Sequence, residues 1–139
     1  MDKIHLTWAD IDKATDNIVL QIKEKGLKPD TILGIPRGGL IIAVILSHKL
    51  NIPYTTSIKK MQESALILMA DDISDTGKTF QNELKYQSLF FSLKKFITSS
   101  IHIAPNTSFI PDIFYQKTNG EWIVYPWETD NTSKADYKE

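Results

Sequence analysis

The segment from Leu66 to Phe80, LILMADDISDTGKTF, constrains the fold of this chain more than any other part of its sequence. Its first residues, Leu66 to Ala70, form a continuous apolar run that is short enough for a strand buried on both faces. Polar residues begin where such a strand would end, so Asp71 and Asp72 are expected at its carboxyl edge. Ligands of open α/β sheets bind in the crevice beyond those edges. We therefore expect a ligand site at this point.

The residues that follow, Asp75 to Thr79, have the composition of an anion-binding turn. Gly77 can adopt a positive φ or let a phosphate approach closely, and Thr76 and Thr79 add hydroxyl donors. A helix that starts after this turn would direct its unpaired N–H groups toward the same space. We expect a phosphate at the turn, while the neighbouring carboxylates suit sugar hydroxyls, Mg²⁺ or a proton in transfer.

Two alternative interpretations apply to the same segment. An Asp-rich turn can simply cap a helix, so Asp75 or Thr76 could be the N-cap of a helix that begins near Gly77. The ending Gly-Lys-Thr also occurs in the P-loop of nucleoside triphosphate enzymes, but that motif needs a glycine where this chain has Asp72. The P-loop is excluded, whereas the capping interpretation stays open.

A second glycine turn lies upstream, where the apolar stretch Thr31 to Gly34 is followed by Pro36, Arg37, Gly38 and Gly39. Arg37 is the only arginine in the chain. A guanidinium between a proline and two glycines is well shaped for bidentate contact with phosphate oxygens, and a solvated turn arginine is the plain alternative.

Three segments resemble those of a known family, the type I phosphoribosyltransferases, and they occur in that family's order. Ala70 to Thr79, ADDISDTGKT, resembles its phosphoribosyl pyrophosphate signature, and Thr31 to Leu40, TILGIPRGGL, resembles its pyrophosphate loop. Trp122 to Glu128, WIVYPWE, resembles the base-binding segment of the short xanthine, hypoxanthine and guanine enzymes. The resemblance implies a mainly parallel central sheet flanked by helices, with a small C-terminal base-binding hood.

The resemblance also implies a role for each matching position. Asp71 and Asp72 would hold the ribose hydroxyls and Mg²⁺, and Asp75 would steer a proton on the incoming base. The base would lie against Trp122 and the backbone of Ile123. The site for phosphoribosyl pyrophosphate would comprise Arg37, Gly38, Gly39, Asp71, Asp72, Asp75, Thr76, Gly77, Lys78 and Thr79.

The implied activity is the Mg²⁺-dependent transfer of 5-phosphoribose from phosphoribosyl pyrophosphate to a purine nucleobase. The reaction releases pyrophosphate and belongs to nucleotide salvage. Two departures from the family pattern bear on this activity. Ala104 stands where purine-type enzymes carry a lysine, although Lys117 could substitute for it. Only Lys59 to Ser64 stand where the family has a long mobile flap. The alternative is therefore a regulatory protein that binds phosphoribosyl pyrophosphate or a nucleotide without turnover.

Apolar segments that alternate with helical patterns predict an α/β fold, with a mainly parallel sheet covered on both faces. Helices are expected over residues 8–25, 40–50 and 79–95, strands over 31–34, 54–58, 65–70 and 97–104, and extended pieces at 113–115 and 122–125. Residues 1–128 are expected to form one phosphoribosyltransferase-like domain, and residues 129–139 a polar, flexible tail.

Composition narrows the class of protein further. The net charge is −1, with lysines interspersed among acidic residues, so no basic face for nucleic acid is expected. The chain has no cysteine, which excludes disulfides and thiolate chemistry. It shows no leader and no long apolar span, and we expect a cytoplasmic protein without membrane contact. The apolar cluster between Phe90 and Ile97 is expected in the core or in a dimer face, and a homodimer or higher homo-oligomer is expected.

Overall fold

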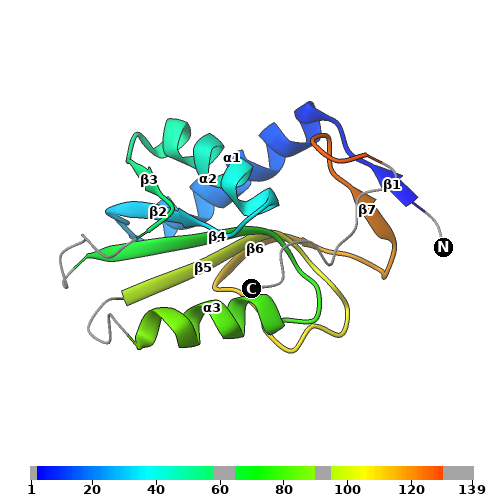
Figure 1. Cartoon of the computed structure of the whole chain (residues 1–139). Helices are drawn as coiled ribbons and strands as arrows, with labels where there is room; N and C mark the ends of the chain where they lie inside the picture. The colour runs from blue at the N-terminus through cyan, green and yellow to red at the C-terminus, as the bar shows by residue number, and fades with distance from the viewer. Residues whose placement is uncertain (1–2, 58–64, 90–94, 130–139) are drawn as a thin grey trace.

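The computed structural model describes residues 3–57, 65–89 and 95–129, and a central parallel sheet runs through it (Figure 1). The strand order of this sheet is β3-β2-β4-β5-β6. The strands are β2 (Thr31–Gly34), β3 (Tyr54–Thr55), β4 (Leu66–Ser74), β5 (Lys95–Ile103) and β6 (Ile113–Lys117). Every pair of neighbours in this order is parallel. The expected α/β class with a parallel sheet is confirmed.

Helices cover both faces of this sheet (Figure 1). The helices α1 (Trp8–Glu24) and α2 (Gly38–Leu50) lie on one face, and α3 (Lys78–Ser88) lies on the other. A capping box fixes the start of α1, because the Thr7 hydroxyl accepts from the Asp10 N–H while the Asp10 carboxylate accepts from the Thr7 N–H. In the described part of the chain, no helix is long and apolar enough to cross a bilayer.

The strand β4 separates two apolar cores. Leu68 and Ala70 pack in the larger core under α1 and α2, whereas Ile67 and Met69 pack against Phe80 of α3. All four of these strand residues are 0% exposed. Burying one such side chain contributes about 1.5–3 kcal/mol for the larger residues. The apolar run therefore forms a strand buried on both faces, as the sequence indicates.

The predicted end of this strand at Ala70 is wrong. The strand β4 continues to Ser74 because β5 runs beside it, with Asp71 opposite Ser100 and Ser74 opposite Ile103. Its other neighbour, β2, stops earlier, since the last pair there joins Gly34 to Ala70. Asp71 and Asp72 thus lie within β4 but beyond the carboxyl end of β2.

Other boundaries differ from the predicted ones. The helix α2 begins at Gly38 rather than at residue 40, and β3 is limited to Tyr54–Thr55. The predicted helix 79–95 ends at Ser88, and Lys95 already belongs to β5. The predictions for residues 59–64 and for the tail beyond Thr129 lie outside the described residues. Of the apolar cluster between Phe90 and Ile97, Phe96 and Ile97 are described, and both pack in the apolar cores.

A second, two-stranded sheet was not predicted from the sequence. It joins β1 (Lys3–His5) to β7 (Trp122–Val124) in parallel, so the two ends of the described chain meet. This sheet lies beyond the end of β4 from which the chain turns toward α3 (Figure 1). Three-residue strands show too little alternation to be recognised locally, and their pairing depends on residues far apart in sequence.

Candidate active site

The turn between β2 and α2 is packed so tightly that its glycines cannot carry a side chain. A Cβ on Gly34 would lie 2.7 Å from the carbonyl oxygen of Gly39, and a Cβ on Gly39 would overlap the Ala70 carbonyl of β4. The Ile35 N–H donates to the same Ala70 oxygen at 2.9 Å. Arg37 is exposed and precedes the first residue of α2. The peptide bond between Pro36 and Arg37 is cis.

The acidic residues of β4 lie directly beside this turn. A Cβ on Gly38 would overlap the carboxylate of Asp72, so this carboxylate rests against the glycine backbone. Its Oδ1 accepts from the Ile73 N–H at 2.7 Å, and Asp71 Oδ1 accepts from the Asp72 N–H at 2.8 Å. Asp71 is buried, whereas Asp72 is half-buried and Asp75 is exposed. The acids therefore range from the protein interior to the surface along one short segment.

The Tyr125 hydroxyl lies behind these acids, and its pKa responds to their charge. Burial raises the pKa of this hydroxyl well above its ordinary value of 10.0. Negative charges nearby raise the pKa further, and they belong to Asp72, Asp71, Glu128 and Asp75. The structure thus brings the three acids of the central segment together with the segment that follows β7.

The turn from Asp75 to Gly77 leads into a helix that begins without a side-chain cap. Gly77 is the N-cap of α3 with φ of 93°, and at this position it makes no side-chain capping bond. The capping interpretation for Asp75 is therefore not met, although the Thr76 hydroxyl accepts from the Lys78 N–H at 3.2 Å. The first turn of α3 also contains no acidic residue. Free N–H groups and the positive end of a helix form an environment that suits an anion.

A loop after β5 supports this turn, and the sequence did not predict it. The Ala104 N–H donates to the Ser74 carbonyl at 3.0 Å, and the Ser108 N–H donates to the Thr76 carbonyl at 3.0 Å. The Phe109 ring stacks on Phe80 of α3 with ring centroids 5.2 Å apart. A Cβ on Gly77 would lie 2.5 Å from the Phe109 nitrogen, so the loop approaches the glycine closely. The contact pattern explains why a glycine is needed here beyond its positive φ.

The predicted base-binding residues lie on β7. Trp122 is half-buried and Ile123 is 4% exposed. Farther along, the Trp127 ring stacks on Tyr125 at 5.0 Å and contacts Trp8 at 5.9 Å. Trp127 thus packs between Tyr125 and Trp8, while the contact of a base with Trp122 stays a prediction.

A metal ion at this site would need oxygen atoms from its ligand. Over residues 3–57, 65–89 and 95–129, no three His, Asp or Glu side chains converge to hold a metal. Asp71 and Asp72 offer two carboxylates, and Mg²⁺ in proteins is often bound by one or two carboxylates together with substrate phosphates. The donor set fits a Mg²⁺ ion that arrives with a phosphorylated ligand.

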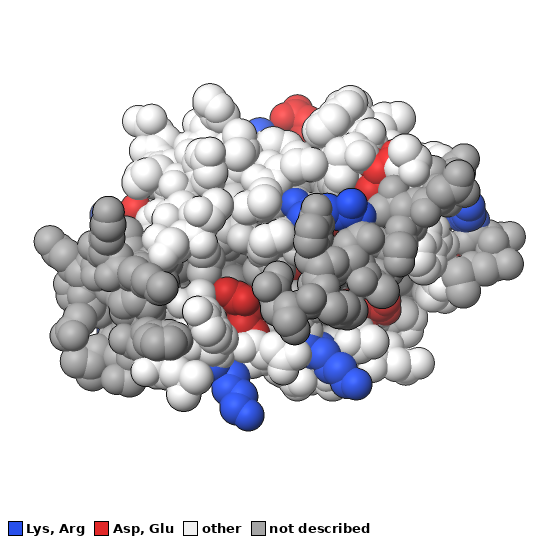
Figure 2. All heavy atoms as spheres, in the orientation of Figure 1, with Lys and Arg blue, Asp and Glu red and all other residues white. Residues whose placement is uncertain are grey.

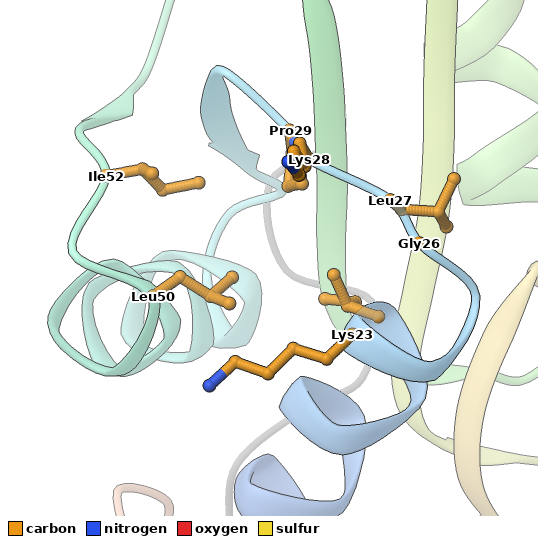
Figure 3. A pocket seen from close by; sticks show the side chains of 8 residues that line it. Lys23, Gly26, Leu27, Lys28, Pro29, Leu50 and Ile52 are labelled. Atoms are coloured by element: carbon orange, nitrogen blue, oxygen red, sulfur yellow. The ribbon is translucent and has the colours of Figure 1, made fainter.

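A cavity of about 380 Å³ lies elsewhere (Figure 3). It is lined by Leu50 and Ile52 on one side and by Lys23 and Leu27 on the other. These residues lie at the carboxyl ends of α1 and α2 or just before strands of the parallel sheet. The cavity therefore lies at the amino ends of the strands, on the opposite edge of the sheet from the acidic residues. It contains none of the predicted site residues.

Comparison with known proteins identifies the family. The sequence model of the phosphoribosyl transferase domain matches residues 2–66. A xanthine-guanine phosphoribosyltransferase of Cereibacter sphaeroides is 26% identical over 89% of this chain and 86% of that protein.

Solved structures agree with this match. A purine phosphoribosyltransferase from Pyrococcus horikoshii is 33% identical with a TM-score of 0.83, covering 96% of this chain and 99% of its own. A xanthine-guanine-hypoxanthine phosphoribosyltransferase of Helicobacter pylori, 21% identical, has the same fold with a TM-score of 0.80 over 92% of this chain and 95% of its own. The expected resemblance is confirmed, and the chain belongs to the type I phosphoribosyltransferase family of enzymes.

Proposed function

We propose that this protein transfers 5-phosphoribose from phosphoribosyl pyrophosphate to a purine base and releases pyrophosphate, as a step of nucleotide salvage. The purine substrate is supported by the similarity to purine-type relatives. The observation that carries the assignment to this site is the position of the Asp72 carboxylate, which rests against the glycine turn at Gly38 on the short segment that also bears Asp71 and Asp75.

The pentose would be held by groups at both of its ends. Its 5-phosphate would lie at the turn from Asp75 to Thr79, where the uncapped start of α3 supplies N–H donors. Each hydrogen bond to a charged oxygen contributes about 1.5–3 kcal/mol, so three or four would anchor the ligand. Its pyrophosphate would lie on Arg37, Gly38 and Gly39, in the turn whose glycines let the backbone pack against Asp72 and the Ala70 carbonyl of β4.

The ribose hydroxyls would contact Asp71 and Asp72, which would also hold Mg²⁺. The ion would neutralise negative charge on the departing pyrophosphate. The protein's own task is to orient the anomeric carbon toward the base and to keep water away from a cation-like sugar. Asp75, exposed at the turn, would accept or guide the proton that the base loses.

The base would lie against Trp122 and the backbone of Ile123 on β7. Ala104 cannot bond an exocyclic oxygen of a purine, but Lys117 is the last residue of β6 and pairs with Ile103, next to Ala104. This register supports Lys117 as the substitute group. Replacing Lys117 by Met should therefore raise KM for 6-oxopurines more than KM for adenine.

A second copy of the chain is a further part of this proposal. The helix α2 is apolar on all sides from Gly38 to Leu46, and its outer face includes Val44, which is 37% exposed, with Ile41 and Ile45 half-buried. The surface over α2 is largely without charged side chains in Figure 2. A helix that is apolar all round is usually buried. Val44→Lys should shift the protein toward the monomer in sedimentation velocity if this face is a dimer contact.

One experiment tests the proposed activity directly. The protein is incubated with phosphoribosyl pyrophosphate, Mg²⁺ and xanthine, hypoxanthine, guanine or adenine in turn, and pyrophosphate release is measured. We expect release with at least one purine and none without Mg²⁺. Binding of phosphoribosyl pyrophosphate without release for any base would instead support the regulatory protein.

A further inference from the structure

Two polar side chains, His102 and Tyr125, are buried together behind the acidic residues. His102 lies on β5 and is 5% exposed, and Tyr125 follows β7 and is 0% exposed. The His102 Nδ1 and the Tyr125 hydroxyl are 2.8 Å apart. The same hydroxyl donates to the carbonyl oxygen of Asp72 at 3.3 Å.

The hydrogen count at the Tyr125 hydroxyl fixes the direction of both bonds. A phenol has one hydrogen to donate, and here it points to the Asp72 carbonyl. With this assignment, the bond to His102 runs from Nδ1–H to the phenol oxygen. The three groups form a chain from His102 through Tyr125 to the backbone of β4.

This chain controls a side chain of the proposed site. The Asp72 carbonyl and the Ile73 N–H belong to one planar peptide unit, so fixing the carbonyl also fixes the N–H. That N–H donates to Asp72 Oδ1 at 2.7 Å. The Tyr125 hydroxyl therefore orients the Asp72 carboxylate through two hydrogen bonds, and this carboxylate rests against Gly38.

Tyr125 is itself held firmly by the segment after β7. Its N–H donates to Glu128 Oε1 at 3.0 Å, and the Glu128 N–H donates back to the Tyr125 carbonyl at 2.9 Å. The Trp127 ring stacks on its ring with an interplanar angle of 8°. The strand proposed to bind the base is thus joined to the strand proposed to bind the sugar.

We propose that Tyr125, supported by His102, is a positioning residue that sets the Asp72 carboxylate for phosphoribosyl pyrophosphate and its Mg²⁺. This inference rests on the proposed function of Asp72. It assigns to Tyr125 no contact with the substrate.

The test compares Tyr125→Phe with Tyr115→Phe. The first substitution removes the hydroxyl and keeps the stacked ring. Tyr115 is half-buried on β6, and among the described residues its hydroxyl makes no hydrogen bond. We expect Tyr125→Phe to raise KM for phosphoribosyl pyrophosphate about tenfold and to require more Mg²⁺, with KM for the base within about twofold. Tyr115→Phe should leave these constants unchanged.

Two further readouts separate positioning from a merely structural role. Tyr125→Phe would release the Asp72 carbonyl and with it the peptide unit that carries the Ile73 N–H. Because this N–H would then be held less firmly against Asp72 Oδ1, we expect its exchange with solvent to be about tenfold faster in Tyr125→Phe, measured by NMR. His102→Asn keeps an N–H donor near the position of Nδ1 and should retain most of the wild-type KM, whereas His102→Leu should resemble Tyr125→Phe.

Unchanged Ile73 exchange in Tyr125→Phe would overturn the inference. The inference would also be overturned if Tyr125→Phe raised KM equally for phosphoribosyl pyrophosphate and for the base and lowered the Tm. If the wild-type protein releases no pyrophosphate with any base, the proposed activity fails. The positioning role is then decided by Ile73 exchange and by the calorimetric Kd for phosphoribosyl pyrophosphate with Mg²⁺, neither of which needs turnover.

Discussion

The Asp72 carboxylate lies against the backbone of Gly38 so closely that a methyl group on this glycine would overlap it. The contact joins the acidic strand β4 to the start of α2, two points that are separated in sequence by the rest of α2 and by β3. It places Asp72, proposed to bind the sugar, beside Gly38, the residue that follows Arg37 in the turn proposed to bind pyrophosphate. The relationship makes Gly38 a sensitive probe of the site.

Gly38→Ala should therefore lower kcat/KM for phosphoribosyl pyrophosphate by about tenfold or more, because either Asp72 or the turn must move. Gly26→Ala is the control, since a Cβ there meets nothing within 4 Å, although its φ of 67° makes alanine unfavourable. That control should cost about 1 kcal/mol in stability and leave kcat/KM unchanged. Steady-state kinetics and urea unfolding measure the two effects. Equal kinetics for both variants would contradict the contact.

Arg37→Ala should weaken the binding of pyrophosphate more than the binding of a ribose monophosphate. Loss of a bidentate charged contact costs about 1.5–3 kcal/mol, which is roughly 10- to 100-fold in affinity. Ribose 5-phosphate, which would lie at the Asp75 turn, should bind within about twofold of the wild-type affinity. Arg37→Lys keeps the charge without the planar fork, so its affinity for pyrophosphate should lie between those of the wild type and Arg37→Ala. Isothermal titration calorimetry measures the affinity for both ligands. An unchanged affinity for pyrophosphate would show that Arg37 does not belong to the site.

Asp75→Asn should reduce turnover far more than binding. The substitution preserves the shape of an exposed turn residue but removes its ability to accept a proton, and such groups contribute about 10²- to 10⁴-fold to rate. The Kd for phosphoribosyl pyrophosphate should change by less than about threefold. Glu24→Gln, at the exposed end of α1, is the matched control and should have no effect. A parallel loss of binding and turnover would show that Asp75 holds the ligand rather than the proton.

The sequence predicted those parts of the fold that depend on local apolar runs. The strand Thr31–Gly34 and the start of α1 at Trp8 were predicted correctly, because a buried run and a capping residue mark them. The strand β4 was placed correctly but ended too early. Its polar residues suggested an end, whereas pairing with β5 continues to Ser74. Tertiary pairing overrides local composition at this point.

The parts that could not be predicted depend on contacts between distant residues. No local signal links β1 to β7, or folds the loop at Ser108 over the turn at Thr76. The same holds for His102, whose buried bond to Tyr125 spans 23 positions and which sequence alone could assign only to the surface or the core. The residues of the proposed site were recognisable from motifs, whereas the groups that orient them were not.

A separate cluster at Lys49 fixes α2 to α1 far from these motifs. The Lys49 ammonium lies 2.6 Å from Asp12 Oδ1 and 2.7 Å from Asp16 Oδ1, and it also donates to the Thr15 hydroxyl at 2.8 Å. Burial opposes the charge, but the hydrogen bonds to both carboxylates outweigh it, so the pKa of Lys49 is raised above its ordinary value of 10.5. The charged form is therefore the form that stabilises the fold.

Lys49→Met should lower the free energy of unfolding at neutral pH by about 1 kcal/mol, since the methionine keeps the apolar stem and the two carboxylates remain solvated. A raised folded-state pKa means that this contribution is fully present below about 10.5 and is lost as pH rises through the folded value. The difference between wild type and variant should thus be constant from pH 7 to 10 and shrink above it. Urea unfolding across this range measures it, with Lys85→Met, an exposed lysine without an ion pair among the described residues, as the control. A difference that grows above pH 10.5, or a control that behaves like Lys49→Met, would contradict the assigned role.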